Sequence, residues 1–155
     1  MALIVLLLLI IFGQPSARRV LTVGDEIAAA DVTEFYYTVA GSTNPPDYQR
    51  YRFSVEDGRY LFYHETRAGD HWPLTEADIT VSGSKELTAA EWAEFWALLD
   101  GGQVRSREDD ASAGGSGPWL YLYWQGDRDR YQQFSFADAG RLAAFEDFCR
   151  ALSEE

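Results

Sequence analysis

Few residues in this chain have side chains of the kind that catalysis or metal binding requires. The sequence contains two histidines, His64 and His71, and a single cysteine, Cys149. The histidines lie near Glu65 and Asp70, but the pattern His-Glu-x4-Asp-His matches no established ligand spacing such as His-Glu-x-x-His. The sequence therefore indicates neither a metal site nor any other cofactor.

Two further residues are poor candidates for a catalytic nucleophile. Cys149 falls on the apolar face of a C-terminal helical pattern, where a free cysteine behaves as a small buried hydrophobic residue. Ser116 follows Gly114-Gly115, but Pro118 stands where a G-x-S-x-G nucleophile elbow needs its second glycine. The plentiful carboxylates leave one catalytic alternative open, a glycan hydrolase that acts through two Asp or Glu side chains.

The charge of the chain excludes one large class of partner. Thirteen Lys and Arg against 25 Asp and Glu give a formal net charge of −12 at pH 7. Proteins that bind nucleic acids neutralise phosphates with a basic face, and the longest basic run here is the pair Arg18-Arg19. We therefore expect no nucleic-acid partner, and the same negative field disfavours anionic membrane surfaces.

The first 17 residues have the pattern of a secretory signal peptide. Ala2–Phe12 is an unbroken run of eleven apolar residues, which is shorter than the roughly 20 residues of a membrane span. Small residues follow it up to Ala17, as in a cleavage region, although no basic residue precedes it. We expect an exported protein (secreted, periplasmic or on the cell surface) with no stable membrane span after residues 1–17 are removed. The alternative is a buried N-terminal strand or helix.

The elements predicted after this segment form a single α+β domain over residues 32–153. Residues 18–31 are expected to be a leader or linker, with a short strand within 20–31 as the alternative. Inside the domain, two hairpins and extra strands are expected to build a mainly antiparallel sheet, which two amphipathic helices cover.

The clearest local signal is a hairpin centred on Asp57-Gly58. Alternating apolar segments flank this dipeptide, which supplies the positive φ angles of a type I′ turn. A two-residue loop pairs Val55 with Tyr60 and Phe53 with Phe62, and both pairs lie on one face of the sheet. The turn chemistry and the hydrophobic pattern therefore predict the same register.

Two helices are predicted from their N-terminal caps and apolar stripes. Thr88 and Glu91 form a capping box, and Leu87 can pack on Trp92 as a hydrophobic staple. The second helix follows Asp138 and closes the domain. We expect the apolar faces of these elements to bury one common core, made of Phe53, Phe62, Trp92, Phe95, Trp96, Leu99, Phe145 and Leu152.

The order of these features resembles that of small exported bacterial proteins of unknown function. The shared features are the Asp-Gly hairpin, the helix start from Leu87, the Gly-Ser-Gly loop, the strand from Trp119 and the final Phe-x-x-Phe-Cys helix. They cover roughly residues 32–153. The resemblance implies export from a bacterium and brings no activity with it.

The aromatic content of 15% points to a binding surface, which we place on the second hairpin. If an even loop of two or four residues closes this hairpin, Trp119 and Tyr121 share a face with Phe134 and Phe136. The helices are expected to cover that face, so the other face is left as an exposed patch. Its residues, together with two residues of a preceding loop, are the candidate binding set: Leu120, Leu122, Trp124, Tyr131, His71 and Trp72.

The sequence thus favours an exported, non-catalytic binding domain, and a protein is the favoured partner. A glycan-binding module is the alternative, beside the carboxylate-dependent glycan hydrolase. A glycan site is expected to combine aromatic side chains with Asp, Asn or Gln in a groove, whereas a protein site is flatter and rimmed by charge. If another element covers the patch, the sequence predicts no functional surface.

Overall fold

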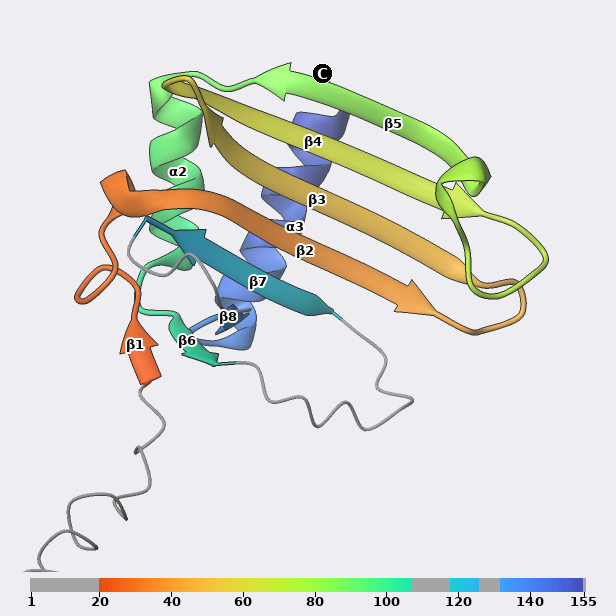
Figure 1. Ribbon diagram of the computed structural model, residues 1–155, viewed down its shortest axis with the longest axis horizontal. Helices are drawn as coiled ribbons and strands as arrows, with labels where there is room; N and C mark the ends of the chain where they lie inside the picture. The colour runs from red at the N-terminus through yellow and green to blue at the C-terminus, as the bar shows by residue number, and fades with distance from the viewer. Residues whose placement is uncertain (1–19, 107–117, 126–131, 155) are drawn as a thin grey trace, which may run out of the picture.

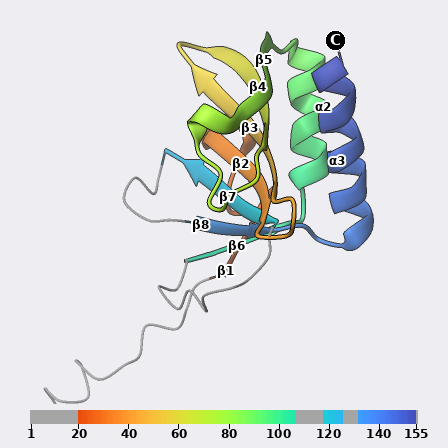
Figure 2. The ribbon, with the colours of Figure 1, turned by 90° about the vertical axis from the view of Figure 1, so that its right-hand side faces the viewer.

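One antiparallel sheet and two helices make up the structure, a computed structural model that describes residues 20–106, 118–125 and 132–154. The eight strands lie in the order β1-β6-β8-β7-β2-β3-β4-β5. The helices α2 (Ala89–Leu99) and α3 (Ala139–Glu154) lie side by side on the same face of the sheet (Figures 1 and 2). The expected α+β class with a mainly antiparallel sheet is therefore confirmed.

The strands fall into two groups by the distance along the chain between paired segments. Four strands that are consecutive in sequence are also neighbours in the sheet, and they are β2 (Val32–Gly41), β3 (Asp47–Glu56), β4 (Arg59–Ala68) and β5 (Ile79–Glu86). The other four strands each pair with a strand that is not their neighbour in sequence, as β1 pairs with β6 and β7 with β2, and they are β1 (Val20–Thr22), β6 (Gln103–Ser106), β7 (Trp119–Trp124) and β8 (Gln132–Ser135). Short 3-10 helices precede β2 and β5: η1 (Ala29–Asp31) and η2 (Glu76–Asp78).

The connection between β3 and β4 is the tight turn expected at Asp57-Gly58. Asp57 has a φ of 52° and Gly58 a φ of 77°, the left-handed backbone that this turn type requires. Val55 pairs with Tyr60 and Phe53 with Phe62, so the register agrees with the prediction.

The start of α2 is fixed by the predicted capping box. The Thr88 hydroxyl accepts a hydrogen bond from the Glu91 N–H at 3.2 Å, and the Glu91 carboxylate accepts one from the Thr88 N–H at 2.7 Å. Lys85 also donates to Glu91 at 2.8 Å. The hydrogen bonds from Lys85 and Thr88 lower the pKa of Glu91 to about 2. At α3, the carboxylate of Asp138 accepts from the Arg141 N–H at 2.9 Å, as expected of an N-cap.

We expect the Thr88→Ala substitution to lower the free energy of unfolding by about 1 kcal/mol, because the first turn of α2 loses its side-chain acceptor. Urea denaturation measures the change. Thr88→Ser is the matched control, since it keeps the hydroxyl, and it should stay close to wild type. Equal losses in the two variants would show that the cap is not the cause.

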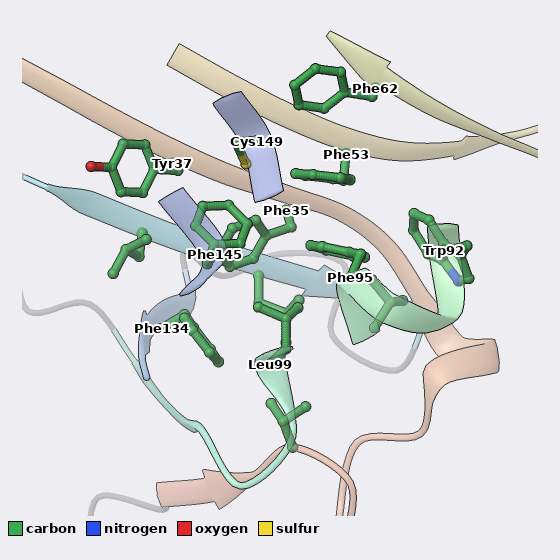
Figure 3. Close-up of a cluster of buried hydrophobic side chains, with 14 of the residues drawn as sticks. Phe35, Tyr37, Phe53, Phe62, Trp92, Phe95, Leu99, Phe134, Phe145 and Cys149 are labelled. Carbon is green, nitrogen blue, oxygen red and sulfur yellow. The ribbon is translucent and has the colours of Figure 1, made fainter. Parts of the chain in front are cut away.

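The core lies between the helices and the sheet, and six phenylalanines pack at its centre among aliphatic side chains (Figure 3). Phe35 on β2 is fully buried, and its ring lies 5.4–5.6 Å from the rings of Phe95, Phe134 and Phe145. The residues expected to share one core do so, except that Trp96 is only partly buried at its edge.

The segment from Val20 belongs to this fold, so the expectation of a leader or linker over 18–31 is wrong for residues 20–31. β1 pairs with β6, and the side chains of Val23 and Ile27 are each 1% exposed within the core. The alternative of a short strand is therefore the one found. Residues 1–17, where a signal peptide is expected, lie outside the described residues. Within residues 20–106, 118–125 and 132–154, no helix has the length and apolarity that crossing a membrane requires.

The register of β7 and β8 differs from the expected one. Tyr121 pairs with Gln133, so an odd number of residues separates the paired positions, and the prediction of an even loop is wrong. As a result, Leu120 and Leu122 face the helices and are buried in the core, where they are 8% and 0% exposed. Trp124 is partly buried against the same core. Both faces of β7 are apolar, so the hydrophobic pattern alone does not fix which face is buried.

Candidate functional site

The sheet face opposite α2 and α3, called here the open face, carries aromatic and charged side chains in rows. Each row consists of residues paired across neighbouring strands, whose backbones lie about 4.8 Å apart. The central row crosses six strands, and its members are partly or fully exposed: Gln133, Tyr121, Tyr36, Arg52, Tyr63 and Ser84. The residues that β7 presents on the open face are therefore Trp119, Tyr121 and Tyr123, and not the expected Leu120 and Leu122, which are buried.

Two flanking rows lie on either side of the central row. One contains Tyr123, Glu34, Ser54, Leu61 and Glu86. The other contains Trp119, Thr38, Arg50, Glu65 and Ser82. The tyrosines of the central row are thus bordered on both sides by rows that contain charged side chains.

Arg52 ties the central row to the first flanking row. Its guanidinium lies 5.8 Å from the ring centroid of Tyr36 and donates to the carboxylate of Glu34, with an Nε–Oε1 distance of 3.0 Å. A second nitrogen of Arg52 donates to Glu56 at 3.3 Å. The ring of Tyr36 meets that of Tyr123 edge-on at 6.1 Å. These contacts hold the aromatic rings in place on the open face.

Glu34 and Glu56 also bear on the alternative of a glycan hydrolase. Both carboxylates bind the same cation, Arg52, and their side chains are 31% and 47% exposed. A general acid of such an enzyme needs a desolvated carboxyl group, which keeps its proton at neutral pH. The geometry here shows instead two partly exposed carboxylates that are hydrogen-bonded to one arginine.

Glu65 of the second flanking row forms a buried ion pair with Arg67, which lies two residues farther along β4. Glu65 is 3% and Arg67 is 9% exposed. Arg67 donates to one carboxylate oxygen of Glu65 from two nitrogens, at 3.1 and 2.6 Å, and the Tyr63 hydroxyl donates to the other oxygen at 2.6 Å. Burial alone would raise the pKa of Glu65, but the hydrogen bonds from Tyr63 and Arg67 outweigh it and lower the pKa.

The segment between β4 and β5 lies against one end of the open face. Leu74 in this segment is 7% exposed and packs with Ala40, Tyr48 and the partly buried Trp119. The carbonyl oxygen of Leu74 accepts a hydrogen bond from Arg67 at 3.4 Å. A small second hydrophobic cluster therefore closes this end of the face.

The candidate residues His71 and Trp72 lie in the same segment and are exposed. Trp72 is 49% exposed, and the Nε2 of His71 lies 3.2 Å from a carboxylate oxygen of Asp78. His64 is not near them on this face, because it pairs with Tyr51 on the helix side of the sheet. Within the described part of the chain, no three His, Cys, Asp or Glu side chains are grouped as metal ligands would be.

Cys149 is a residue of α3 whose side chain is buried in the core between the helices and the sheet (Figure 3). Burial raises the pKa of its thiol well above the ordinary value, with a smaller contribution from nearby Glu146. A nucleophilic cysteine needs the thiolate form, and this environment disfavours it. The buried hydrophobic position predicted for Cys149 is confirmed.

The structure therefore brings together only part of the predicted binding set. Leu120 and Leu122 are buried, Trp124 is partly buried, and Tyr131 lies outside the described residues. The sequence analysis missed the open-face side chains of β2, β3 and β4: Tyr36, Arg50, Arg52 and Tyr63. The hairpin register already contained that signal, because these residues of β3 and β4 alternate with the phenylalanines predicted to face the core.

No protein-family model, no curated protein and no solved structure matches this chain. Among the described residues, the open face is the feature whose geometry bears on function.

Proposed function

We propose that the chain is an exported, non-catalytic domain that binds a protein partner through the open face. One observation carries the proposal: the helices cover one face of the sheet (Figure 2), and the strand register places rows of Tyr, Trp and Arg on the other. Tyrosine, tryptophan and arginine are the residue types that supply most of the binding energy at protein interfaces. Export is part of the proposal and rests on the sequence of residues 1–17.

The charge of the open face supports the same function. In the described strands, register places on it five arginines (Arg50, Arg52, Arg59, Arg67 and Arg105) and four glutamates (Glu34, Glu56, Glu65 and Glu86). The whole chain has a net charge of −12, so its excess of acidic groups lies elsewhere. An aromatic surface with charges of both signs is suited to orient a complementary protein surface.

A protein is favoured over a glycan by how the aromatic and charged residues are distributed. Three tyrosines lie in the central row together with Arg52, and glutamates of the flanking rows are already bound by arginines, as Glu34 is bound by Arg52. This matches an aromatic interface centre with a polar rim. Glutamates that are engaged by arginines are less available to bind sugar hydroxyl groups.

Photo-crosslinking in the native host tests this proposal. The photoreactive residue p-benzoylphenylalanine is placed at Tyr63 on the open face, or at the exposed Ala144 on α3 as a matched control. We expect one discrete protein adduct from position 63 and none from position 144. The adduct is identified by mass spectrometry, and the purified partner is then bound to the purified domain.

The affinity of variants for that purified partner then supports or overturns the proposal. Tyr36→Ala and Tyr63→Ala should each raise the Kd about tenfold or more, while the conservative Tyr36→Phe and the helix control Ala144→Ser should not. Thermal unfolding of each variant shows that it is folded. Unchanged affinity in both Tyr→Ala variants would overturn the proposal. Retention on a polysaccharide that Tyr36→Ala abolishes would assign the face to a glycan instead.

A further inference from the structure

Arg50 lies in the middle of the open face and has hydrogen-bond donors that the described residues do not use. Its side chain is 36% exposed. The Nε donates to the Thr38 hydroxyl at 3.4 Å, and the guanidinium lies 5.4 Å from the ring centroid of Tyr48. Neither terminal nitrogen of Arg50 makes a hydrogen bond within residues 20–106, 118–125 and 132–154; the nearest carboxylate oxygen, of Glu65, is 3.9 Å away.

Glu65 is not free to become the partner of Arg50. One of its oxygens accepts both hydrogen bonds from Arg67, and the other accepts the hydrogen bond from Tyr63. Glu65 is also buried, so it cannot rotate outward to meet Arg50 without breaking the ion pair. Arg50 is therefore a cation that is positioned by its neighbours; its terminal N–H groups make no hydrogen bond among the described residues, and the carboxylate 3.9 Å away is already bound by Arg67 and Tyr63.

Unlike Arg50, the two other arginines nearby donate hydrogen bonds to carboxylates from their terminal nitrogens. Arg67 is buried and bound to Glu65, and Arg52 is bound to both Glu34 and Glu56. Around Arg50, one uncompensated positive charge is thus available rather than a cluster. A phosphate group carries a charge of roughly −1.5 to −2 at pH 7 and is best held by several cations. A single guanidinium matches a carboxylate, which it can bind through two parallel hydrogen bonds.

We infer that Arg50 receives the carboxylate of an Asp or Glu side chain of the protein partner. This inference rests on the function proposed above and names the group that the open face recognises. Thr38 and Tyr48 orient the guanidinium before binding, which reduces the side-chain entropy lost in the complex. The aromatic side chains of the face exclude water around the pair and so strengthen it.

The inference is tested first on the isolated domain with blocked tripeptides of the form Ac-Gly-X-Gly-NH2. NMR follows the side-chain Nε–Hε signals of the arginines as the peptide with Glu at X is added. We expect the Arg50 signal to shift and saturate, the Arg150 signal on α3 to stay in place, and the peptide with Gln at X to cause no shift. A stronger response to phosphoserine at X would overturn the assignment to a carboxylate, as would equal shifts at Arg50 and Arg150.

The second test uses the crosslinked partner and separates this inference from the proposed function. Arg50→Gln should raise the Kd about tenfold, Arg50→Lys by less because the charge remains, and the matched helix variant Arg150→Gln should have no effect. The salt dependence of the Kd should also become weaker in Arg50→Gln. If Tyr36→Ala weakens binding and Arg50→Gln changes the Kd less than twofold, the proposed function stands and this inference is wrong. If Tyr36→Ala, Tyr63→Ala and Arg50→Gln all leave the Kd unchanged, both are wrong.

Discussion

The Phe95→Ala variant is expected to lose about 3–5 kcal/mol of its free energy of unfolding. Phe95 is fully buried, and its ring stacks on that of Phe53 at 4.0 Å, with an angle of 7° between the ring planes. It also meets Phe35 at 5.6 Å and Trp92 at 5.0 Å. Phe95 therefore joins α2 to the sheet, and its removal leaves a cavity that closely packed neighbours cannot fill.

Urea denaturation of wild type and variant measures this loss. Trp96→Ala is the comparison, because the two residues are adjacent in α2 and differ in burial. Trp96 is only partly buried at the edge of the core, so its removal should cost less than that of Phe95. A larger loss for Trp96→Ala would show that α2 presents a different face to the sheet.

The Arg67→Met variant is also expected to lose about 3 kcal/mol or more of its free energy of unfolding. The substitution leaves the buried Glu65 carboxylate without the cation that binds it most closely. Glu65 would keep the hydrogen bond from Tyr63 and the weaker ion pair with Arg50 at 3.9 Å. Arg150→Met, at an exposed pair with Asp147 on α3, removes the same charge and should cost little. Equal losses in the two variants would show that the burial of the pair is unimportant.

The same variant has an expected pH dependence, whose sign follows from the pKa of Glu65. In the wild type this pKa lies below its ordinary value, so the ionised carboxylate stabilises the fold above about pH 4.5. That contribution is lost as the pH falls through the lowered pKa. Without Arg67, burial dominates and raises the pKa of Glu65, so the folded variant binds the proton more readily.

The stability difference between wild type and Arg67→Met should therefore narrow as the pH falls from 7 toward 3. Urea denaturation at a series of pH values measures it. Glu65→Gln should show a shallower loss of stability on acidification than wild type, because the titrating group is absent. A difference that widened toward low pH would contradict the assigned direction of the pKa.

Local signals in the sequence predict the parts of the fold whose geometry is set by adjacent residues. Asp57-Gly58 predicts both a turn and its register, since only one loop length suits that turn type. Thr88 and Glu91 predict the first residue of α2 because both halves of a capping box lie within four residues. Neither feature depends on a distant part of the chain.

The pairing of β7 with β8 could not be predicted in the same way. The turn between them has no dipeptide that specifies its length, and a change of one residue exchanges the two faces of a strand. In β7 both faces are apolar, with leucines on one and aromatic residues on the other. The leucine face is the one that packs against the core under α2 and α3, and a local sequence pattern does not reveal such packing.

The open face was predictable only in part for a related reason. The ion pair of Glu65 and Arg67 follows from alternation, because residues two apart in a strand share a face. The contacts of Arg52 with Glu34 and of Tyr48 with Leu74 join segments that no short-range pattern connects. The candidate site therefore depends on the order of strands in the sheet, which no short-range pattern in the sequence specifies.

That sheet order has a consequence for how the chain folds. β2 to β5 are joined by short connections, whereas Val20 pairs with Arg105 and Phe35 with Leu122, which requires the closure of very long loops. Closing long loops costs more entropy, so the β2–β5 meander is expected to form first and to exchange its amide hydrogens last. Until β7 docks, the outer edge of β2 has unpaired backbone groups. During that interval the chain is open to pairing with a strand of another molecule, so its yield on refolding should fall as its concentration rises.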